Sequence, residues 1–423
     1  MNKLAIAVAA DSAVTINVGG GQKIYQSANK LFALGKHIPV GIMVYGNSDF
    51  MSVPWETIIK TFRFHLGKRT FPTINDYTKE FIEFLEGNRR LFPSDAQNTY
   101  VEIDSKSYLY NLGKDFRDNV KQVLGNEVNI PESRVSEIIT SNILERLTNI
   151  KKRDPAQGLP RGFPGYIKRL YSKQIDNAIN EIFDKIPLTA SSRNNLKTLI
   201  SEIFYRDVLG NYSGVVIMGF GTTDVFPKAN AFIVRGVIAN RLWRTITQDK
   251  TVGKDSASSI MSFAQSEMVK TFMEGIDPEL AEFLMGMFGT LLTSYIDTVA
   301  NAIPELRDTQ REEFRKRIAQ VCEEQLSQLE DGFNKYRTSE HVNPIMSMIS
   351  ALPKDELARV AEALVNLTSF KRRVSAQAET VAEPIDVAVI SRGDGFVWVK
   401  RKHYFPSSLN PGWGQGLIGD THE

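Results

Sequence analysis

The stretch LAIAVAADSAVTINVGGGQKIYQSANKLFAL, residues 4–34, decides how the fold of this 423-residue chain is interpreted. Leu4 to Ala10 is a continuous apolar run, which is the pattern of a strand covered on both faces. Asp11 ends the run, although aspartate is depleted in strands unless a local group satisfies it. Glycines 19–21 predict a turn, and KLFAL, which starts at Lys30, begins a second strand. A buried strand normally has neighbours on both sides, and little chain precedes this one.

The composition is that of a soluble globular protein, with 42% hydrophobic and 24% charged residues. A formal net charge of +2 gives no overall field that would favour nucleic acid or an anionic membrane. The single cysteine, Cys322, excludes an intramolecular disulfide and suits a reducing cytoplasm. Five scattered histidines lack the spacing of a zinc site, so we expect neither a metal nor a cofactor.

No run of about 18 apolar residues is present, so the sequence predicts no membrane-spanning helix. Met-Asn-Lys followed by an apolar stretch mimics a secretory signal, but Asp11 interrupts that stretch and no clear cleavage motif follows. We therefore expect a cytoplasmic protein.

Three strand-rich segments alternate with two long helical tracts. The first segment spans residues 4–46, the second contains strands at 212–221, 228–240 and 241–247, and the third spans 385–405. Helical periodicity begins at Trp55, and a second helix follows TIND, which is plausible capping chemistry. Residues 90–208 and 256–370 are predicted to be mainly helical, with an irregular link at 153–166 and a glycine cap at Gly275.

This order predicts an α+β fold with two antiparallel sheets sandwiched between helical layers. RGDG, residues 392–395, lies between two alternating runs and predicts a hairpin turn. The predicted division is a core in three parts with two insertions. The core parts are 1–90, 211–275 and 381–405, the helical insertions are 91–210 and 276–380, and 406–423 is a loose tail.

Five motifs, in this order, resemble proteasome β-type subunits, which are N-terminal-nucleophile (Ntn) hydrolases. They are VAADSAVT (8–15), NKLFAL (29–34), VGIMVYGNSDF (40–50), SGVVIMGFGTTDVFPKANAFIVRG (213–236) and EPIDVAVISRGDG (383–395). The resemblance covers about residues 4–90, 212–275 and 383–400, and implies a four-layer αββα sandwich. The helices of 90–208 and 280–375 have no counterpart in a compact subunit, so the chain resembles a divergent, insert-bearing relative of the bacterial type.

The resemblance also implies the chemistry of a threonine-type peptidase. In this family a threonine hydroxyl attacks the substrate, its own α-amine acts as base, and a lysine lowers the pKa of the hydroxyl. By motif, Lys30 matches that lysine and Asp11 the aspartate that pairs with it. Gly46 matches the residue whose backbone N–H stabilises the oxyanion. Thr15 matches a residue that pairs with the substrate strand. Such a subunit works in a ring or stacked homo-oligomer on peptide substrates.

The sequence departs from the family at two points. The strand that carries the nucleophile is missing, and ETVAEPID (379–386) replaces an expected Asp-x-x-Ser-Gly-Gly-like segment. Ala382 and Glu383 stand where glycines would be, and Glu379 is a weak substitute for the acidic residue. Either the start of the chain is assigned too far downstream, which we favour, or the protein is an inactive member. We favour the first because a bare apolar strand edge is a liability.

Plainer interpretations compete for each residue. Asp11 alone is more often a turn acceptor, and Lys30 alone is more often a solvated lysine of an edge strand. The Met/Phe stripe at 283–292 fits core packing or a subunit contact better than a cofactor site. Two functions therefore stay open: an Ntn amidohydrolase, and a non-catalytic scaffold or peptide-binding subunit of the same fold. A binding module whose function resides in the helical insertions is a remote third.

Overall fold

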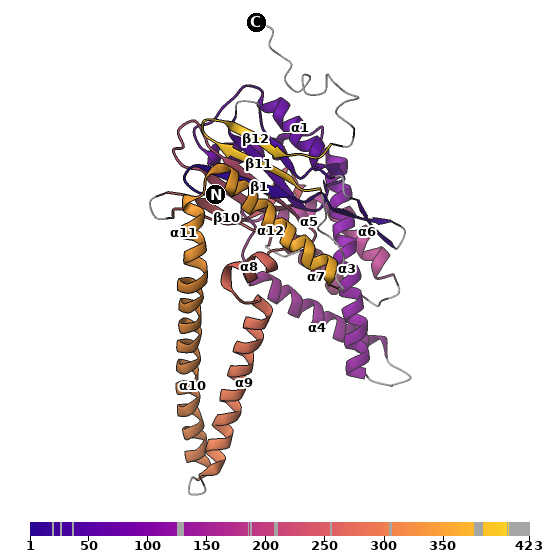
Figure 1. Cartoon of the computed structure of the whole chain (residues 1–423). Coiled ribbons are helices and arrows are strands. Elements are labelled where there is room, and N and C mark those ends of the chain that lie inside the picture. The colour runs from indigo at the N-terminus through magenta and orange to yellow at the C-terminus, as the bar shows by residue number, and fades with distance from the viewer. Residues whose placement is uncertain are drawn as a thin grey trace. The chain divides into compact units, whose positions relative to one another are not determined.

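The computed structural model describes residues 1–18, 21–25, 28–35, 38–124, 131–184, 186, 188–206, 210–253, 256–303, 307–375, 384–403 and 405. Figure 1 shows the course of the chain and its labelled elements, which divide into two compact units. The first unit contains Met1–Ser27, Thr251–Arg392 and Val397–Glu423, and the second contains Ala28–Lys250 and Gly393–Phe396. Helices and antiparallel strands occur in both units, which confirms the predicted α+β class. The segment 379–383, including Glu379, and the tail from residue 406 lie outside the described residues.

The second unit is built on a five-stranded sheet of order β10-β9-β8-β5-β4. Its strands are β4 (Leu31–Ala33), β5 (Val40–Gly46), β8 (Ser213–Gly219), β9 (Lys228–Ile238) and β10 (Arg241–Thr251), and a short ribbon of β6 (Asp49–Phe50) and β7 (Val53–Pro54) follows β5. β5 and β8 pair antiparallel from Val40↔Gly219 to Gly46↔Ser213. These strands confirm the predictions at 212–221, 228–240 and 241–247.

Two helices, α1 (Trp55–Leu66) and α2 (Ile74–Gly87), pack on one face of this sheet. Trp55, Phe62 and Phe81 are buried there among the apolar side chains of β5 and β8. α2 begins with a capping box: the Thr73 side chain accepts from the Asp76 N–H, and the Asp76 carboxylate accepts from the Thr73 N–H. The predicted helix at Trp55 and the predicted cap are therefore confirmed.

The helical tract predicted at 90–208 is also confirmed. It contains α3 (Ser94–Leu124), α4 (Glu132–Lys151), α5 (Phe163–Leu170), α6 (Ser172–Ile182) and α7 (Ala190–Ile203). These helices share a core of their own, in which Phe116, Ile143 and Ile175 are buried. The link at 153–166 is irregular until α5 begins at Phe163.

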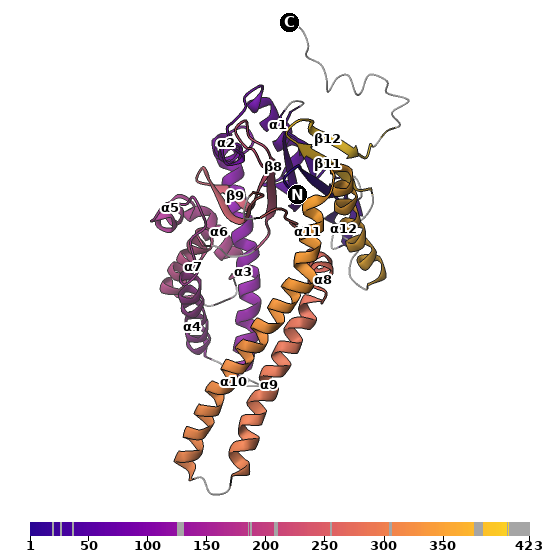
Figure 2. The same ribbon diagram turned by 60° about the vertical axis from the view of Figure 1, so that its left-hand side comes forward.

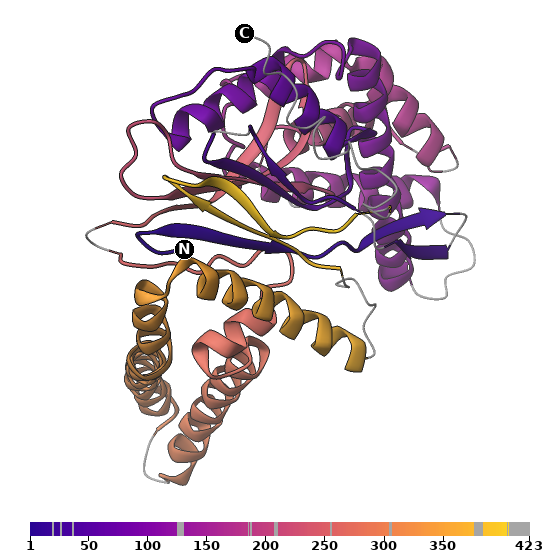
Figure 3. The ribbon, with the colours of Figure 1, turned by 45° about the horizontal axis from the view of Figure 1, so that its top comes forward.

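The first unit contains a three-stranded sheet of order β1-β11-β12, formed by β1 (Ala5–Ala10), β11 (Asp386–Ser391) and β12 (Gly395–Lys400). β1 and β11 pair antiparallel from Ala5↔Ser391 to Ala10↔Asp386. RGDG forms the turn between β11 and β12, as predicted. Helix α12 (Lys354–Val374) runs along one face of this sheet (Figure 3), and a second ribbon pairs β2 (Val14–Val18) with β3 (Gly21–Tyr25).

The remaining helices of the first unit form a long antiparallel hairpin and its base (Figure 2). They are α8 (Glu267–Glu274), α9 (Pro278–Ala302), α10 (Asp308–Tyr336), a π-helical turn (Arg337–Val342) and α11 (Asn343–Ala351). The helix predicted from residue 256 begins only at Glu267, which corrects that boundary. Gly275 ends α8 in the left-handed conformation, φ +73°, as its predicted cap role requires.

Helix α9 is more apolar over its whole length than a count of continuous apolar residues indicates. Among the described residues, it alone has the length and mean hydropathy of such a span, and only 6% of its most apolar window is buried. Glycines and hydroxyl side chains interrupt its apolar run without adding charge, so counting continuous apolar residues misses it.

Candidate functional site

Two of the four predicted site residues, Lys30 and Gly46, lie at the same end of neighbouring strands in the second unit. Lys30 immediately precedes β4, and its carbonyl accepts from the Val44 N–H at 2.8 Å, which extends the β4–β5 ladder by one residue. Gly46 is the last residue of β5, two positions beyond Val44. The half-buried lysine and the exposed glycine are therefore brought to one sheet end.

Gly46 has a backbone conformation that only glycine adopts easily. Its φ is +85°, and a Cβ atom at this position would stand 2.8 Å from the Tyr212 carbonyl oxygen. N–H groups alternate between the two edges of a strand, and the Val44 N–H points to the β4 edge. The Gly46 N–H is therefore directed to the same edge, beyond the described ladder, where it can donate to an external acceptor.

The other two predicted residues, Asp11 and Thr15, belong to the first unit. Asp11 follows β1, and its Oδ2 accepts from the Ala13 N–H at 3.0 Å, which is the local turn role of an aspartate. The neighbouring Ser12 is fully buried and donates its hydroxyl to the Pro384 carbonyl. Thr15 lies in β2, opposite Ile24 of β3.

The entry into β1 has a specific geometry. The Asn2 N–H donates to the Ala5 carbonyl at 3.0 Å, so residues 2 and 5 face each other across a tight turn. Met1 exchanges two hydrogen bonds of 2.8 Å with Ser259, one from each backbone N. Met1 and Asn2 therefore pair antiparallel with Ser259 and Ser258, and Asn2 also turns back onto the first residue of β1.

This geometry also shows which edge of β1 is available. Ala5 accepts from Asn2, so the backbone groups of Ala5, and by alternation those of Ala7 and Ala9, face away from β11. In the described part of the chain β1 is the terminal strand of its sheet on that side. The edge from Ala7 to Ala9 is thus a place where a further antiparallel strand can pair.

Sequence reasoning missed a buried ion pair next to Asp11. Asp386 is 2% exposed and stands opposite Ala10 at the start of β11. It accepts from the Lys402 N–H at 2.8 Å and from the Lys402 ammonium group. A carboxylate buried to this degree needs such a partner, so Lys402 fixes the chain after β12 beside the end of β1. An aspartate at the first position of an apolar strand was the available signal.

A separate cleft of about 660 Å³ lies between α1, α2 and the loop that follows α2. Its lining includes His65, Glu80, Arg89 and Arg90, and none of the four predicted residues. His65 Nε2 and Arg69 Nη1 contact one oxygen of Glu80, at 2.9 and 2.8 Å. Among the described residues, no group of three or more histidine, cysteine or acidic side chains is arranged to hold a metal ion.

No family model matches this chain, and no curated protein or solved structure matches it either. The class of protein must therefore be argued from the fold and the site themselves.

Proposed function

We propose that this chain is the core of a proteasome-like Ntn hydrolase, a threonine-type peptidase or amidohydrolase, with a four-layer αββα core and helical insertions. The observation that carries the proposal is the entry into β1. The Asn2–Ala5 hydrogen bond leaves the edge of β1 from Ala7 to Ala9 open to an antiparallel strand, and the proposal assigns the family's nucleophile strand to that edge. The attacking hydroxyl would be on that strand.

The five-stranded sheet supports the proposal independently. Strands β4 and β5, then helices α1 and α2, then strands β8 to β10 follow one another along the chain in the order that the motifs predict. Side chains on both faces of this sheet are buried, Ile42 and Ile217 on one face and Met43 and Val216 on the other. A sheet buried on both faces is what a central layer of a sandwich requires.

The residues at the end of β4 and β5 fit the chemistry. An ammonium group at Lys30 would stabilise the nucleophile, with Asp11 as its carboxylate partner. The Gly46 N–H would donate to the developing oxyanion, because a glycine at φ +85° keeps this donor clear of a side chain. Thr15, on a two-stranded ribbon, would pair with an extended peptide substrate. We further propose a cytoplasmic homo-oligomer.

The experiment that tests this function is intact-mass measurement and N-terminal sequencing of the protein purified from its native host, followed by labelling with a β-lactone probe. We expect a mature chain longer than this one that begins with threonine, serine or cysteine, and one covalent adduct on that residue. Lys30→Ala should slow the labelling at least about 100-fold, the scale of an acid–base contribution.

Lys60→Ala is the matched control, because Lys60 lies on the surface of α1 and pairs only with Glu56, one turn away, among the contacts described. It should label as fast as the unmodified protein. A native chain that begins at Met1 and takes up no probe would overturn the catalytic proposal. That result would leave a scaffold or peptide-binding subunit of the same fold.

A further inference from the structure

The α9–α10 hairpin presents an apolar face that no described part of the chain covers. Six large side chains of α9 are between 40% and 65% exposed: Leu280, Phe283, Met287, Phe288, Leu291 and Tyr295. Leu280, Phe283, Met287 and Leu291 follow one another at spacings of three and four residues, so they form a continuous stripe along the helix. We call these four residues the α9 stripe; Gly286, one turn after Phe283, borders it on one side.

The exposed area is large enough for a stable protein interface. With about 200 Å² for a fully exposed large side chain, the six α9 residues leave on the order of 600 Å² of apolar-rich surface. The six α9 residues alone therefore reach about 600 Å² for one partner, the lower bound of a stable interface. A standard interface takes about 800 Å² from each partner, whereas scattered exposed residues on a monomer need no partner.

Helix α10 argues against a bilayer as the covering medium. It packs against α9, with Leu326 Cδ2 3.7 Å from where a Gly289 side chain would begin and Arg315 3.1 Å from Asp297. Its 29 residues include 12 charged side chains, several of them paired with one another, such as Arg317 with Glu313 at 2.6 Å. Burying α9 in hydrocarbon would carry these charges into the membrane, at a high cost for each.

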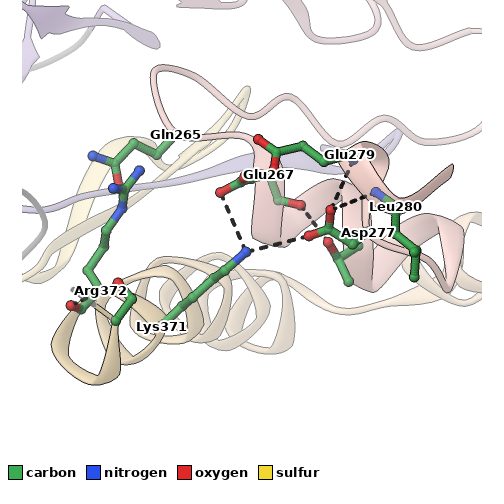
Figure 4. A network of polar contacts seen from close by, with 9 residues as sticks. Gln265, Glu267, Asp277, Glu279, Leu280, Lys371 and Arg372 are labelled. Carbon is green, nitrogen blue, oxygen red and sulfur yellow. Dashed lines mark hydrogen bonds and ion pairs between the residues drawn. The ribbon is translucent and has the colours of Figure 1, made fainter. Parts of the chain in front are cut away.

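The hairpin is also fixed at its base, which suits a preformed docking surface. Lys371 of α12 bridges Glu267 of α8, at 3.5 Å, and Asp277, at 3.6 Å (Figure 4). Asp277 in turn caps α9 by accepting from the Glu279 and Leu280 N–H groups at 2.9 and 3.3 Å. Arg372, the next residue of α12, donates to Gln265 at 2.9 Å.

The surface of α9 has large side chains next to a glycine, an arrangement that can fit the same surface on a second copy of the chain. Gly286 has open space where a side chain would stand, and the exposed Phe283 lies one turn before it. In a twofold interface the same patch serves both partners, so a large side chain of one copy can enter the space over Gly286 of the other. Two hairpins joined in this way place their α9 helices against each other, with each α10 on the outer side.

We propose that the α9 stripe is a homodimer interface through which two copies of this chain join their α9–α10 hairpins. The inference goes beyond the proposed hydrolase function and does not depend on it. The contact would bury the apolar face of α9 and leave the charged residues of α10 in water.

The test is the mass of the full chain by light scattering after size-exclusion chromatography, over a range of concentrations. We expect wild type at twice its 47.5 kDa, or an even-numbered multiple. Gly286→Leu should halve that mass or weaken the dimer at least tenfold. The substitution meets no atom within 4 Å in the monomer and favours the helix, so the free chain should fold normally.

Gly165→Leu is the matched control, because Gly165 is an exposed helical glycine of α5, also with open space around it. It should assemble as wild type does. Met287→Lys, with helicity checked by circular dichroism, should reproduce the effect of Gly286→Leu. A monomeric wild type, or an assembly that Gly286→Leu leaves intact, would overturn the proposal. So would a monomer that floats with phosphatidylcholine vesicles through α9, which would identify a lipid surface as the occupant.

Discussion

Asn2 is the residue on which the entry into β1 depends. Its side chain is fully buried, donates to the Ile349 and Leu352 carbonyls at 3.0 and 2.9 Å, and accepts from the Leu4 N–H at 3.0 Å. Asn2→Ala removes these partners and leaves buried carbonyls unsatisfied, so we expect a loss of about 2–3 kcal/mol in the free energy of unfolding. Urea denaturation measures it. Asn177→Ala, at an exposed position, should stay within about 0.5 kcal/mol of wild type, and an equal loss there would contradict the argument.

Gly46 gives a second prediction at the scale of one residue. Gly46→Ala combines a left-handed backbone with a contact of 2.8 Å to the Tyr212 carbonyl oxygen, so it should destabilise the second unit by about 1–3 kcal/mol. Gly87→Ala is the control, because Gly87 ends α2 with no atom near its Cβ position and should be neutral or slightly stabilising. The midpoints of denaturant unfolding of the two variants measure this difference. An unchanged midpoint for Gly46→Ala would contradict the prediction, because it would mean that the backbone relaxes without cost.

At this scale the sequence located the candidate site only in part. The motif around Gly46 predicts a strand that ends in glycine, and β5 ends there because the backbone turns to positive φ. The roles of Asp11 and Lys30 stay predictions. For Asp386 the sequence offered only an aspartate at the start of an apolar strand, and for Asn2 it offered no signal, because their partners lie 16 and about 350 positions away.

At the scale of an element, Asp277 at the start of α9 has two roles that can be tested separately: it caps the helix and it pairs with Lys371. Asp277→Asn keeps the oxygen that accepts from the first N–H groups of α9 but removes the charge facing Lys371. Both partners of that pair are about one-third exposed, so the ion pair contributes little. We expect Asp277→Asn to cost under about 0.5 kcal/mol and Asp277→Ala about 1 kcal/mol, measured as shifts in thermal unfolding. Equal losses in the two variants would assign the stabilisation to charge instead.

Helices and turns were predicted well where a few adjacent residues determine them, and poorly where packing against distant residues determines their bounds or exposure. The capping box before α2 and the RGDG turn depend on a few adjacent residues, and both are present. Helix α8 begins later than its apolar pattern suggests, because Ser258 and Ser259 pair with Asn2 and Met1 and the residues from 260 to 266 are irregular. The exposure of α9 could not be predicted, since an apolar helix in a soluble chain is normally buried.

At the scale of the whole molecule, the compact units are defined by pairings that sequence order conceals. Ala5 pairs with Ser391, so the first unit takes strands from both ends of the chain and helices from its second half. A reading of composition along the chain cannot detect such a pairing, because it depends on register between strands about 380 residues apart. The same pairing leaves the other edge of β1, beyond the Asn2–Ala5 turn, without a paired strand among the described residues.

In the polypeptide that begins at Met1, the buried α-amine next to this edge makes the free energy of unfolding depend on pH. Burial lowers the pKa of the Met1 α-amine from 8.0 to about 6, and the amine donates to the Ser259 carbonyl. Between pH 6 and pH 8 the unfolded chain therefore binds the additional proton, so the free energy of unfolding should rise with pH across this window. A shift of two pKa units corresponds to about 2–3 kcal/mol.

Urea denaturation from pH 5 to pH 9 measures this rise, and an N-terminally acetylated chain is its control. Acetylation removes the titrating group but keeps a Met1 N–H that can donate to Ser259. The acetyl group would extend along the edge of β1, where a preceding strand would run. If the edge accepts it, the acetylated chain should match the free chain above pH 8 and exceed its stability by about 2–3 kcal/mol below pH 6. Destabilisation at every pH would show that the edge is closed, and would count against the strand that the proposed hydrolase requires.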